Sequence, residues 1–368
     1  MTISGGSLGS FFAGIALLEH GHEPRIHERS TGELLGRGAG IVAQPVVRRV
    51  FERYGIADPD EFATQSTERH YLARDGRVQQ SRAESIRFTS WDAVYRELRA
   101  QFPDDRYHAG SEVVDVSPAR AAVTVNDDGS IAADLVVAAE GGRSTTRKQL
   151  FPAVEPAVAD YVAWRGTVPE PDLPAPVVET FDRRFVFYQG ADHLILAYFI
   201  PGADGEVDRG ERRLNWVWYD AVDPADRSAV FTDTTGAERQ FTVPPGSVRP
   251  PVLDERLART DDVLPSVFSR AVRATGAPFV QAVYDLAVPE MVIDRVCLLG
   301  DAAFIARPHT AAGTAKAAGD AVTLAEALDG ATETDDALSS WSADRTRYGG
   351  RLVERGRQMS EERLGLGD

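Results

Sequence analysis

The chain has 368 residues, of which 43% are hydrophobic and 26% charged, and its formal net charge is −16. This length suits two domains or one large α/β body, and the composition is that of a soluble globular protein. The acidity argues against nucleic acid and anionic membranes as partners, because both require a basic surface.

The single cysteine, Cys297, excludes an intrachain disulfide or a cysteine metal cluster. The histidines at positions 20, 22, 27, 70 and 108 show no metal-ligand spacing, so no metal site is expected. No apolar run approaches the ~18 residues of a membrane span, and no leader-like segment opens the chain. We therefore expect a cytoplasmic protein.

The first elements are predicted as strand, glycine turn, helix and strand. The strand is Thr2–Ser4, the helix Phe11–His20 ends at Gly21, and a second strand ends near Glu28. Helices are then expected around residues 51–62 and 91–102, the latter capped by Ser90.

Strand patterns dominate the middle of the chain. Residues 111–142 alternate around an acidic turn at 127–129 and end in a buried strand, Leu135–Ala139. From Tyr161 to about Tyr219, short aromatic strands follow one another with no helix between them, which predicts an antiparallel sheet in a separate subdomain. A buried strand within 294–304, a helix from about Gly313 to Leu328, and one or two C-terminal helices complete the prediction.

The opening turn resembles a dinucleotide-binding loop in which Gly5, Ser7 and Ser10 take the three glycine positions. The helix that follows offers free N–H groups to a pyrophosphate. Glu28, 23 residues after Gly5, stands where a ribose-binding carboxylate belongs. The alternative is an ordinary tight turn with a solvated glutamate.

A second motif lies near the C-terminus. A buried strand delivers Gly300 and Asp301 at its carboxyl end, where α/β proteins bind ligands, and Asp301 is placed to accept from a ribityl hydroxyl. The loop from Pro308 to Gly313 then leads into a helix whose N-terminus faces the edge of a flat ring. Taken alone, Asp301 is better explained as a helix cap, but together with the opening turn the ligand role is favoured.

The segment Gly5–Gly9 also fits the Gly-x-Ser-x-Gly string of a hydrolase elbow, with Ser7 as nucleophile and Asp301 and His309 as partners. That elbow normally follows a central strand rather than the first one. The hydrolase hypothesis also leaves Glu28 and the segment Asp134–Arg147 without a role, so it is the weaker one.

Three motifs in this order resemble the single-component FAD-dependent aromatic hydroxylases, the p-hydroxybenzoate hydroxylase-like flavoprotein monooxygenases. They are the opening turn with Glu28, the segment "DLVVAAEGGRSTTR" (Asp134–Arg147), and the Gly300–Asp301 segment. The middle segment has Glu140-Gly141 where the family has Asp-Gly. Stretches such as "GRGAGIVAQP" and "RPHTAAGTAKAAGDA" are most similar to 2,6-dihydroxypyridine 3-hydroxylase-like members.

The resemblance implies an α/β fold: a Rossmann-type FAD-binding domain with an inserted antiparallel β-sheet substrate domain and C-terminal helices. FAD-binding parts are expected at residues 1–72, 86–155 and 271–328. The substrate domain is expected at 73–85 and 156–270, and the C-terminal helices at 329–368.

Carrying the family pattern over residue by residue identifies the expected FAD contacts. Two positions depart from it: Ala315 replaces an asparagine, and Trp91 replaces an arginine whose charge Arg37 is expected to supply. The expected contacts are Gly5, Gly6, Ser7, Leu8, Gly9, Ser10, Glu28, Arg29, Arg37, Gly40, Gln44, Trp91, Val114, Glu140, Gly141, Arg143, Gly300, Asp301, Pro308, Ala311, Ala312, Gly313 and Thr314.

The resemblance also implies the reaction. FAD is reduced by NADH or NADPH, which binds transiently, and one oxygen atom of O2 passes through a flavin hydroperoxide to an electron-rich ring such as a hydroxypyridine or phenol. The expected partners are a small aromatic or heteroaromatic substrate and O2, in a monomer or homodimer. The alternatives are epoxidation, Baeyer-Villiger ring expansion, dehydrogenation, or flavin binding without catalysis.

The substrate-side candidates are fewer. His309, His193 and Tyr198 are the candidate catalytic residues, although strand alternation puts His193 and Tyr198 on opposite faces. For His309 the alternative is a loop histidine that packs on or bonds to the backbone. Trp164, Trp216 and Tyr219 are candidates to sandwich a flat ring, and Arg165 to pair with an anionic group. For these four, the alternatives are core packing and a surface ion pair.

Overall fold

A computed structural model describes residues 1–36, 40–126 and 129–364. Arg37, a predicted FAD contact, and part of the predicted acidic turn at 127–129 lie outside these residues. Within the described residues, no helix is both long and apolar enough to cross a membrane.

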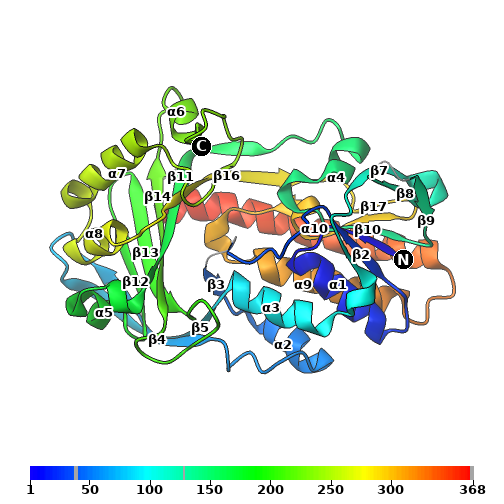
Figure 1. Cartoon of the computed structure of the whole chain (residues 1–368), viewed down its shortest axis with the longest axis horizontal. Coiled ribbons are helices and arrows are strands. Elements are labelled where there is room, and N and C mark those ends of the chain that lie inside the picture. The colour runs from blue at the N-terminus through cyan, green and yellow to red at the C-terminus, as the bar shows by residue number, and fades with distance from the viewer. Residues whose placement is uncertain (37–39, 127–128, 365–368) are drawn as a thin grey trace.

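A six-stranded sheet forms the part of the molecule that holds the N-terminus (Figure 1). Its inner strands pair in parallel, and only the edge strand β17 runs antiparallel. The short first strand predicted at Thr2–Ser4 is confirmed and lies at the centre. In sheet order the strands are β17 (Val292–Ile293), β18 (Val296–Leu298), β10 (Val136–Ala138), β1 (Thr2–Ser4), β2 (Arg25–Glu28) and β6 (Tyr107–Ala109).

Helices cover one face of this sheet, and a small three-stranded sheet packs on the other, where a cluster of valines is buried. Ser90 caps α3 as predicted, accepting the Ala93 N–H at 3.0 Å. The helices on the first face are α1 (Leu8–Glu19), α2 (Pro45–Tyr54), α3 (Trp91–Gln101), α9 (Gly313–Leu328) and α10 (Thr334–Met359). The small sheet comprises β7 (Val113–Ser117), β8 (Ala122–Val125) and β9 (Ser130–Ala132), and α4 (Thr145–Leu150) packs against β7.

The second part is built on a large twisted sheet (Figure 1). Most of its neighbours are antiparallel, but β12 pairs in parallel with β4. In sheet order the strands are β15 (Thr242–Val243), β16 (Phe279–Ala287), β11 (Ala157–Pro169), β14 (Arg213–Ala221), β13 (His193–Ile200), β12 (Arg184–Gln189), β4 (Thr64–Leu72), β5 (Val78–Ser90) and β3 (Gly40–Val42), with β19 (Phe304–Ile305) on β16.

This sheet takes strands from segments predicted to belong to the FAD-binding parts, namely β3, β4, the end of β5, β16 and β19. Helices cover its outer face and bury an aromatic core that includes Trp164, Trp216 and Trp218. They are α5 (Ala175–Phe181), α6 (Arg227–Phe231), α7 (Pro250–Val263) and α8 (Ser266–Arg273).

Two element predictions were wrong. The helix expected around 51–62 is instead α2, because Pro45 is accommodated in its first turn and Gly55, at φ 59°, ends it in the left-handed conformation. The aromatic strands are not free of helix: α5 lies between β11 and β12 and buries Val177 and Phe181. Its seven residues are too few to show a clear helical period.

Candidate active site

The chain turns sharply between β1 and α1, and this turn requires glycine. Gly5 has φ 102°, and a Cβ there would lie 2.7 Å from the Ala139 carbonyl oxygen. A Cβ on Gly6 would lie 2.5 Å from the Glu28 Cβ. The backbone of the turn therefore fits closely between the ends of β10 and β2.

Glu28 closes the turn from the other side. Its buried carboxylate accepts the Gly6 N–H at 2.6 Å and the Ser30 N–H at 2.8 Å. These two charge-assisted bonds hold the carboxylate at the carboxyl end of β2, beside the N-terminus of α1.

A pocket of about 310 Å³ opens over this turn, at the carboxyl ends of β1, β2 and β10. This edge is where open α/β sheets bind nucleotides. The Ser7 side chain makes no capping bond to α1, so its hydroxyl is not used by the fold. The expected FAD contacts that line the pocket are Gly5, Gly6, Ser7, Glu28, Arg29, Trp91, Glu140, Gly141 and Arg143.

Four other expected contacts do not line this pocket. Leu8 and Ser10 are buried in the core, because the first turn of α1 rotates them away from the turn. Gly9 instead allows close packing, since its Cβ would lie 3.2 Å from Leu299. Val114 points to solvent, whereas its neighbour Val113 lines the pocket. The expectation that Ser10 contacts FAD is therefore corrected.

Glu140 holds the turn that follows β10. Its carboxylate accepts from the hydroxyls of Ser4 (2.6 Å), Ser144 (2.5 Å) and Thr146 (2.8 Å) and from the Thr146 N–H (3.0 Å). The buried Arg147 then donates to the carbonyls of Gly142 and Ala302, and so ties this turn to the loop after β18. Two motifs far apart in sequence are thereby joined.

The segment from Gly300 to Thr314, which we call the ring loop, carries the second group of expected FAD contacts. Ala311 adopts φ 51°, a conformation that favours glycine, and its carbonyl accepts from Gln44 Nε2 at 2.6 Å. Asp301 accepts from Lys316 Nζ at 3.1 Å. Lys316 is 1% exposed. In the sequence it is one more polar position on a helix, so nothing there marks it as a site residue.

Helix α10 anchors the ring loop through contacts that the sequence did not reveal. His309 Nε2 donates to the Gly356 carbonyl at 2.8 Å. The buried Arg307 pairs with Asp285 at 3.1 Å and also contacts Ser360. The loop is therefore fixed from both β16 and the C-terminal helix.

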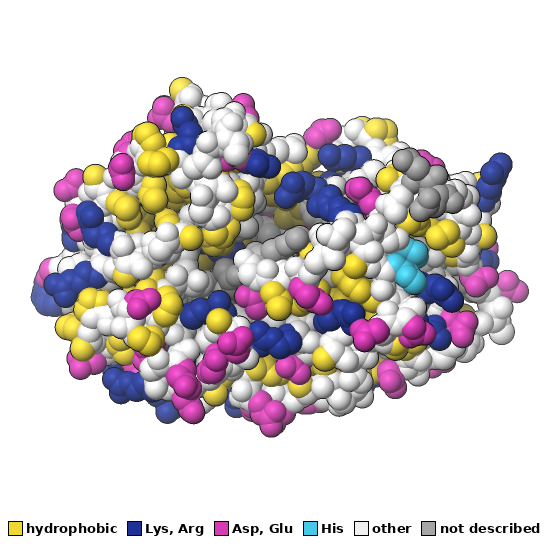
Figure 2. Space-filling view, viewed as in Figure 1, with side chains coloured by type: hydrophobic (Ala, Val, Ile, Leu, Met, Phe, Trp, Pro, Cys, Tyr) yellow, Lys and Arg dark blue, Asp and Glu magenta, His cyan; other side chains and the backbone are white. Residues whose placement is uncertain are grey.

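A cavity of about 960 Å³ lies between the ring loop and the inner face of the large sheet. The molecule is visibly hollowed between its two parts, and Lys and Arg side chains gather beside the hollow (Figure 2). The expected contacts that line the cavity are Gly40, Asp301, Pro308, Ala311, Gly313 and Thr314 from the FAD set, and His309, Tyr198, Tyr219 and Arg165 from the substrate set.

Both cavity tyrosines are held as neutral hydroxyls. Burial raises the pKa of Tyr198 to about 12 and raises that of Tyr219 as well. Tyr198 stacks on Phe88 with ring centroids 3.9 Å apart, and Tyr219 meets the His309 ring edge-on at 5.9 Å. At neutral pH both side chains are hydrogen-bond donors toward the cavity.

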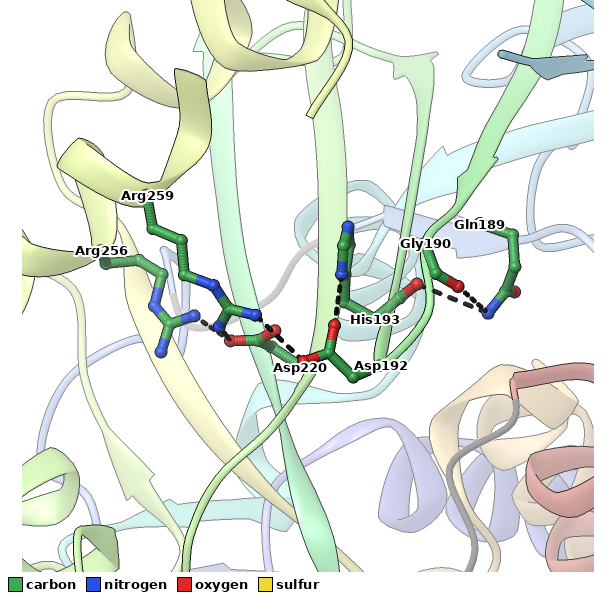
Figure 3. Close-up of polar contacts among 7 residues, drawn as sticks. All are labelled: Gln189, Gly190, Asp192, His193, Asp220, Arg256 and Arg259. Atoms are coloured by element: carbon green, nitrogen blue, oxygen red, sulfur yellow. Dashed lines mark hydrogen bonds and ion pairs between the residues drawn. The ribbon is translucent and has the colours of Figure 1, made fainter. Parts of the chain in front are cut away.

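Three substrate-side candidates lie on the opposite face of the large sheet. Trp164 and Trp216 are buried against the covering helices, because alternation turns their neighbours Arg165 and Val217 toward the cavity. His193 lies with them: its Nδ1 contacts Asp192 at 2.9 Å (Figure 3). Its ring also meets Trp218 edge-on. The expectations of substrate contact for these three are corrected.

The structure does not bring the three candidate hydrolase residues, Ser7, Asp301 and His309, together. Ser7 lines the pocket at the opening turn, whereas Asp301 and His309 line the separate cavity under the large sheet. His309 is bound to α10 and Asp301 to Lys316, so neither side chain forms a relay with Ser7.

The geometry fits FAD. The glycine turn between β1 and α1, with Glu28, suits the adenosine and pyrophosphate. Asp301 and the ring loop suit the ribityl chain and the flat ring. The small residues Ala311, Ala312 and Gly313 leave room for a ring beside the backbone of the loop.

Comparison of the sequence with known proteins also points to FAD binding. Family models described as FAD binding domain-like and FAD binding domain match residues 158–285 and 282–356. The 2,6-dihydroxypyridine 3-monooxygenase of Paenarthrobacter nicotinovorans is 32% identical over 98% of this chain and 90% of its own length. The 6-hydroxynicotinate 3-monooxygenase of Pseudomonas fluorescens is 24% identical over 94% of this chain and 87% of its own length.

Solved structures show the same likeness. The structure of 2,6-dihydroxypyridine-3-hydroxylase from Arthrobacter nicotinovorans has a TM-score of 0.92 and 31% identity, covering 100% of this chain and 93% of that one. A variant of Klebsiella pneumoniae HpxO complexed with FAD has a TM-score of 0.77 at 19% identity, covering 99% and 90%, and shows the shared fold.

Proposed function

Because the chain belongs to the family of FAD-dependent monooxygenases that includes 2,6-dihydroxypyridine 3-monooxygenase, we propose that it hydroxylates a small electron-rich aromatic or heteroaromatic ring, such as a hydroxypyridine or phenol. NADH or NADPH supplies the electrons and O2 supplies the oxygen atom. The observation that carries this proposal is the cavity itself, which has the ring loop on one side and hydrogen-bond donors on the other.

When bound, FAD supplies the redox chemistry that activates O2. The protein supplies position and proton transfer. Asp301 and the backbone of the ring loop are proposed to hold the cofactor, with Gln44 bracing that loop through the Ala311 carbonyl. Glu28 and the Gly5–Ser7 turn are proposed to hold the adenosine end.

The cavity walls are proposed to hold the substrate. Phe185, Phe187, Leu194 and Leu196 give a flat apolar surface that excludes water, while the hydroxyls of Tyr198 and Tyr219 donate to oxygen atoms on the ring. His309 lines the cavity beside Tyr219 and is proposed to accept the proton of a ring hydroxyl, which makes the ring more electron-rich.

The test is direct. Purified protein is expected to carry or take up FAD and to oxidise NADH or NADPH faster when a hydroxypyridine or phenol is added, with a product one oxygen atom heavier than the ring supplied. A protein that does not take up FAD contradicts the proposal. A product of epoxidation, ring expansion or dehydrogenation would instead assign a different reaction to the same site.

A further inference from the structure

Helix α10 packs against the ring loop through a buried glycine, Gly356. A Cβ at this position would lie 3.2 Å from Arg307 N and 3.3 Å from Thr310 Cγ2. Such a Cβ would fit only if the loop moved away by a few tenths of an ångström. The helix therefore approaches the loop as closely as it does because residue 356 has no side chain.

The same glycine also provides a hydrogen-bond acceptor for the loop. Its carbonyl oxygen accepts from His309 Nε2 at 2.8 Å and from the backbone N–H of Ser360. A carbonyl oxygen has two lone pairs, so it can accept both hydrogen bonds. The imidazole ring is thus held against the backbone of α10, in the last turn of that helix.

Helix α10 also holds the start of the ring loop. Arg345 Nε donates to Asp320 Oδ1 at 2.7 Å, and Asp320 Oδ2 accepts the Gly300 N–H at 3.1 Å. Asp320 is 2% exposed, so both contacts lie in a low-dielectric interior that strengthens them. Gly300 opens the ring loop, and its position is therefore tied to α10 by way of α9.

The middle of the loop is held by a buried ionic group. Arg307 and Arg357 both pair with the carboxylate of Asp285, at 3.1 and 3.0 Å. Arg307 also contacts Ser360, the residue that follows α10. These contacts add to those of Gly356, so α10 holds the ring loop both at its start and at its middle.

Helix α10 forms part of the cavity wall as well. Leu352 and Met359 line the same cavity as His309. Residues 352, 356 and 359 are spaced i, i+4 and i+7, so they share one face of the helix. The face that holds His309 is therefore the face that borders the cavity.

We infer that the last turns of α10, residues 352–360, are part of the catalytic site and that Gly356 is the positioning residue of His309. The missing side chain of Gly356 lets the helix approach the ring loop, and its carbonyl oxygen fixes the direction of the imidazole ring. This inference rests on the proposed function, in which His309 accepts the proton of a ring hydroxyl.

The first experiment observes His309 directly. In the FAD-loaded full chain labelled with isotopic histidine, the Nε2–H of His309 is expected to give an NMR signal at neutral pH, because its hydrogen bond slows exchange with water. The signal is assigned by its loss in His309→Ala. Fast exchange of this proton in the parent protein would overturn the inference without any change to Gly356.

Gly356→Ala adds the Cβ for which the loop leaves too little room. Gly350→Ala, in the same helix, is the matched control, because among the residues that the structure describes its Cβ would meet only open space. Both substitutions change helix propensity alike. The His309 signal is expected to move or disappear in Gly356→Ala and to stay in place in Gly350→Ala. Thr310→Ser removes Cγ2 but keeps the hydroxyl that donates to the Arg307 carbonyl, so it is expected to restore part of the signal in Gly356→Ala.

The second experiment tests the catalytic consequence, with 2,6-dihydroxypyridine as the ring. Gly356→Ala is expected to lower the kcat of ring-stimulated NADH or NADPH oxidation by roughly 10-fold, because misplacing a catalytic group by a fraction of an ångström slows the chemical step. In the His309→Ala background the same substitution is expected to cost less than about twofold, because no imidazole is left to position. A merely structural defect would lower kcat equally in both backgrounds.

The inference is overturned if Gly356→Ala and Gly350→Ala give the same His309 signal, or if Gly356→Ala costs as much without His309 as with it. If Gly356→Ala does not fold alone, both glycine variants are compared in the Thr310→Ser background. If no FAD binds and no ring stimulates oxidation, the proposed function has failed, whereas the histidine signal of the chain without FAD still decides whether Gly356 holds His309.

Discussion

Replacing Glu28 with alanine tests whether the opening turn is organised as the structure indicates. The carboxylate is 6% exposed and accepts two backbone N–H groups, from Gly6 at 2.6 Å and from Ser30 at 2.8 Å. The substitution removes both acceptors and any contact that the carboxylate makes with a bound nucleotide.

The structure sets the size of the effect. A hydrogen bond to a charged group contributes about 1.5–3 kcal/mol, so two contribute about 3–6 kcal/mol. Gly6 lines an open pocket, where water replaces part of the lost bond. The free energy of unfolding of the FAD-free protein is therefore expected to fall by about 2–4 kcal/mol. Glu28→Gln keeps one carbonyl acceptor and is expected to lose about half as much.

Urea unfolding of the FAD-free protein measures the change in its free energy of unfolding, and titration of flavin fluorescence measures FAD affinity. We expect Glu28→Ala to weaken FAD binding by roughly 10- to 100-fold, corresponding to the loss of one good hydrogen bond to the nucleotide. Glu61→Ala, an exposed carboxylate, is the matched control. The reasoning is refuted if Glu28→Ala unfolds within about 0.5 kcal/mol of the control and binds FAD equally well.

Three further predictions concern other regions. Ser7→Ala is expected to change stability by less than about 0.5 kcal/mol, because the hydroxyl does not cap α1, and to keep ring-stimulated NADH or NADPH oxidation; complete loss of that oxidation would contradict this prediction. Burial lowers the pKa of His27 to about 4, so the folded state binds fewer protons than the unfolded state between that pH and about 6.5. Stability is therefore complete above about pH 6.5 and falls by roughly 2–3 kcal/mol as the pH drops toward 4, and His27→Asn is expected to flatten that part of the profile in urea titrations; an unchanged profile would contradict it. Asp220→Asn leaves Arg256 and Arg259 facing a neutral amide behind the sheet (Figure 3), and is expected to cost about 3–5 kcal/mol with FAD affinity unchanged, which thermal melting and fluorescence titration would check.

Predictions from the sequence succeeded where the signal is local. The strand Thr2–Ser4, the capped helix at Trp91 and the helix Gly313–Leu328 each carry their own evidence within about one dozen residues: an apolar run, a capping serine, or a stretch of small residues. The motif with Glu28 was readable for the same reason, since a strand, a glycine turn and a helix form one continuous unit.

Predictions failed where neighbours from distant segments decide the outcome. Side-chain alternation along a strand predicts that Trp164 and Arg165 lie on opposite faces of the sheet, but not which of the two faces the cavity. Only the helices that cover the outer face assign the tryptophans to the core and leave Arg165 in the cavity. An aromatic-rich strand is equally consistent with either face.

The sequence by itself determined the α/β fold, the nucleotide turn, the family, and the loop that follows Asp301, because these depend on short contiguous patterns of residue type. The tertiary structure alone decided that α10 holds His309, that Lys316 is buried beside Asp301, and that Gln281 orients Arg165. Each of these contacts joins side chains from separate segments of the chain, and their polar groups acquire a partner only when the packing of the two sheets and α10 brings them together.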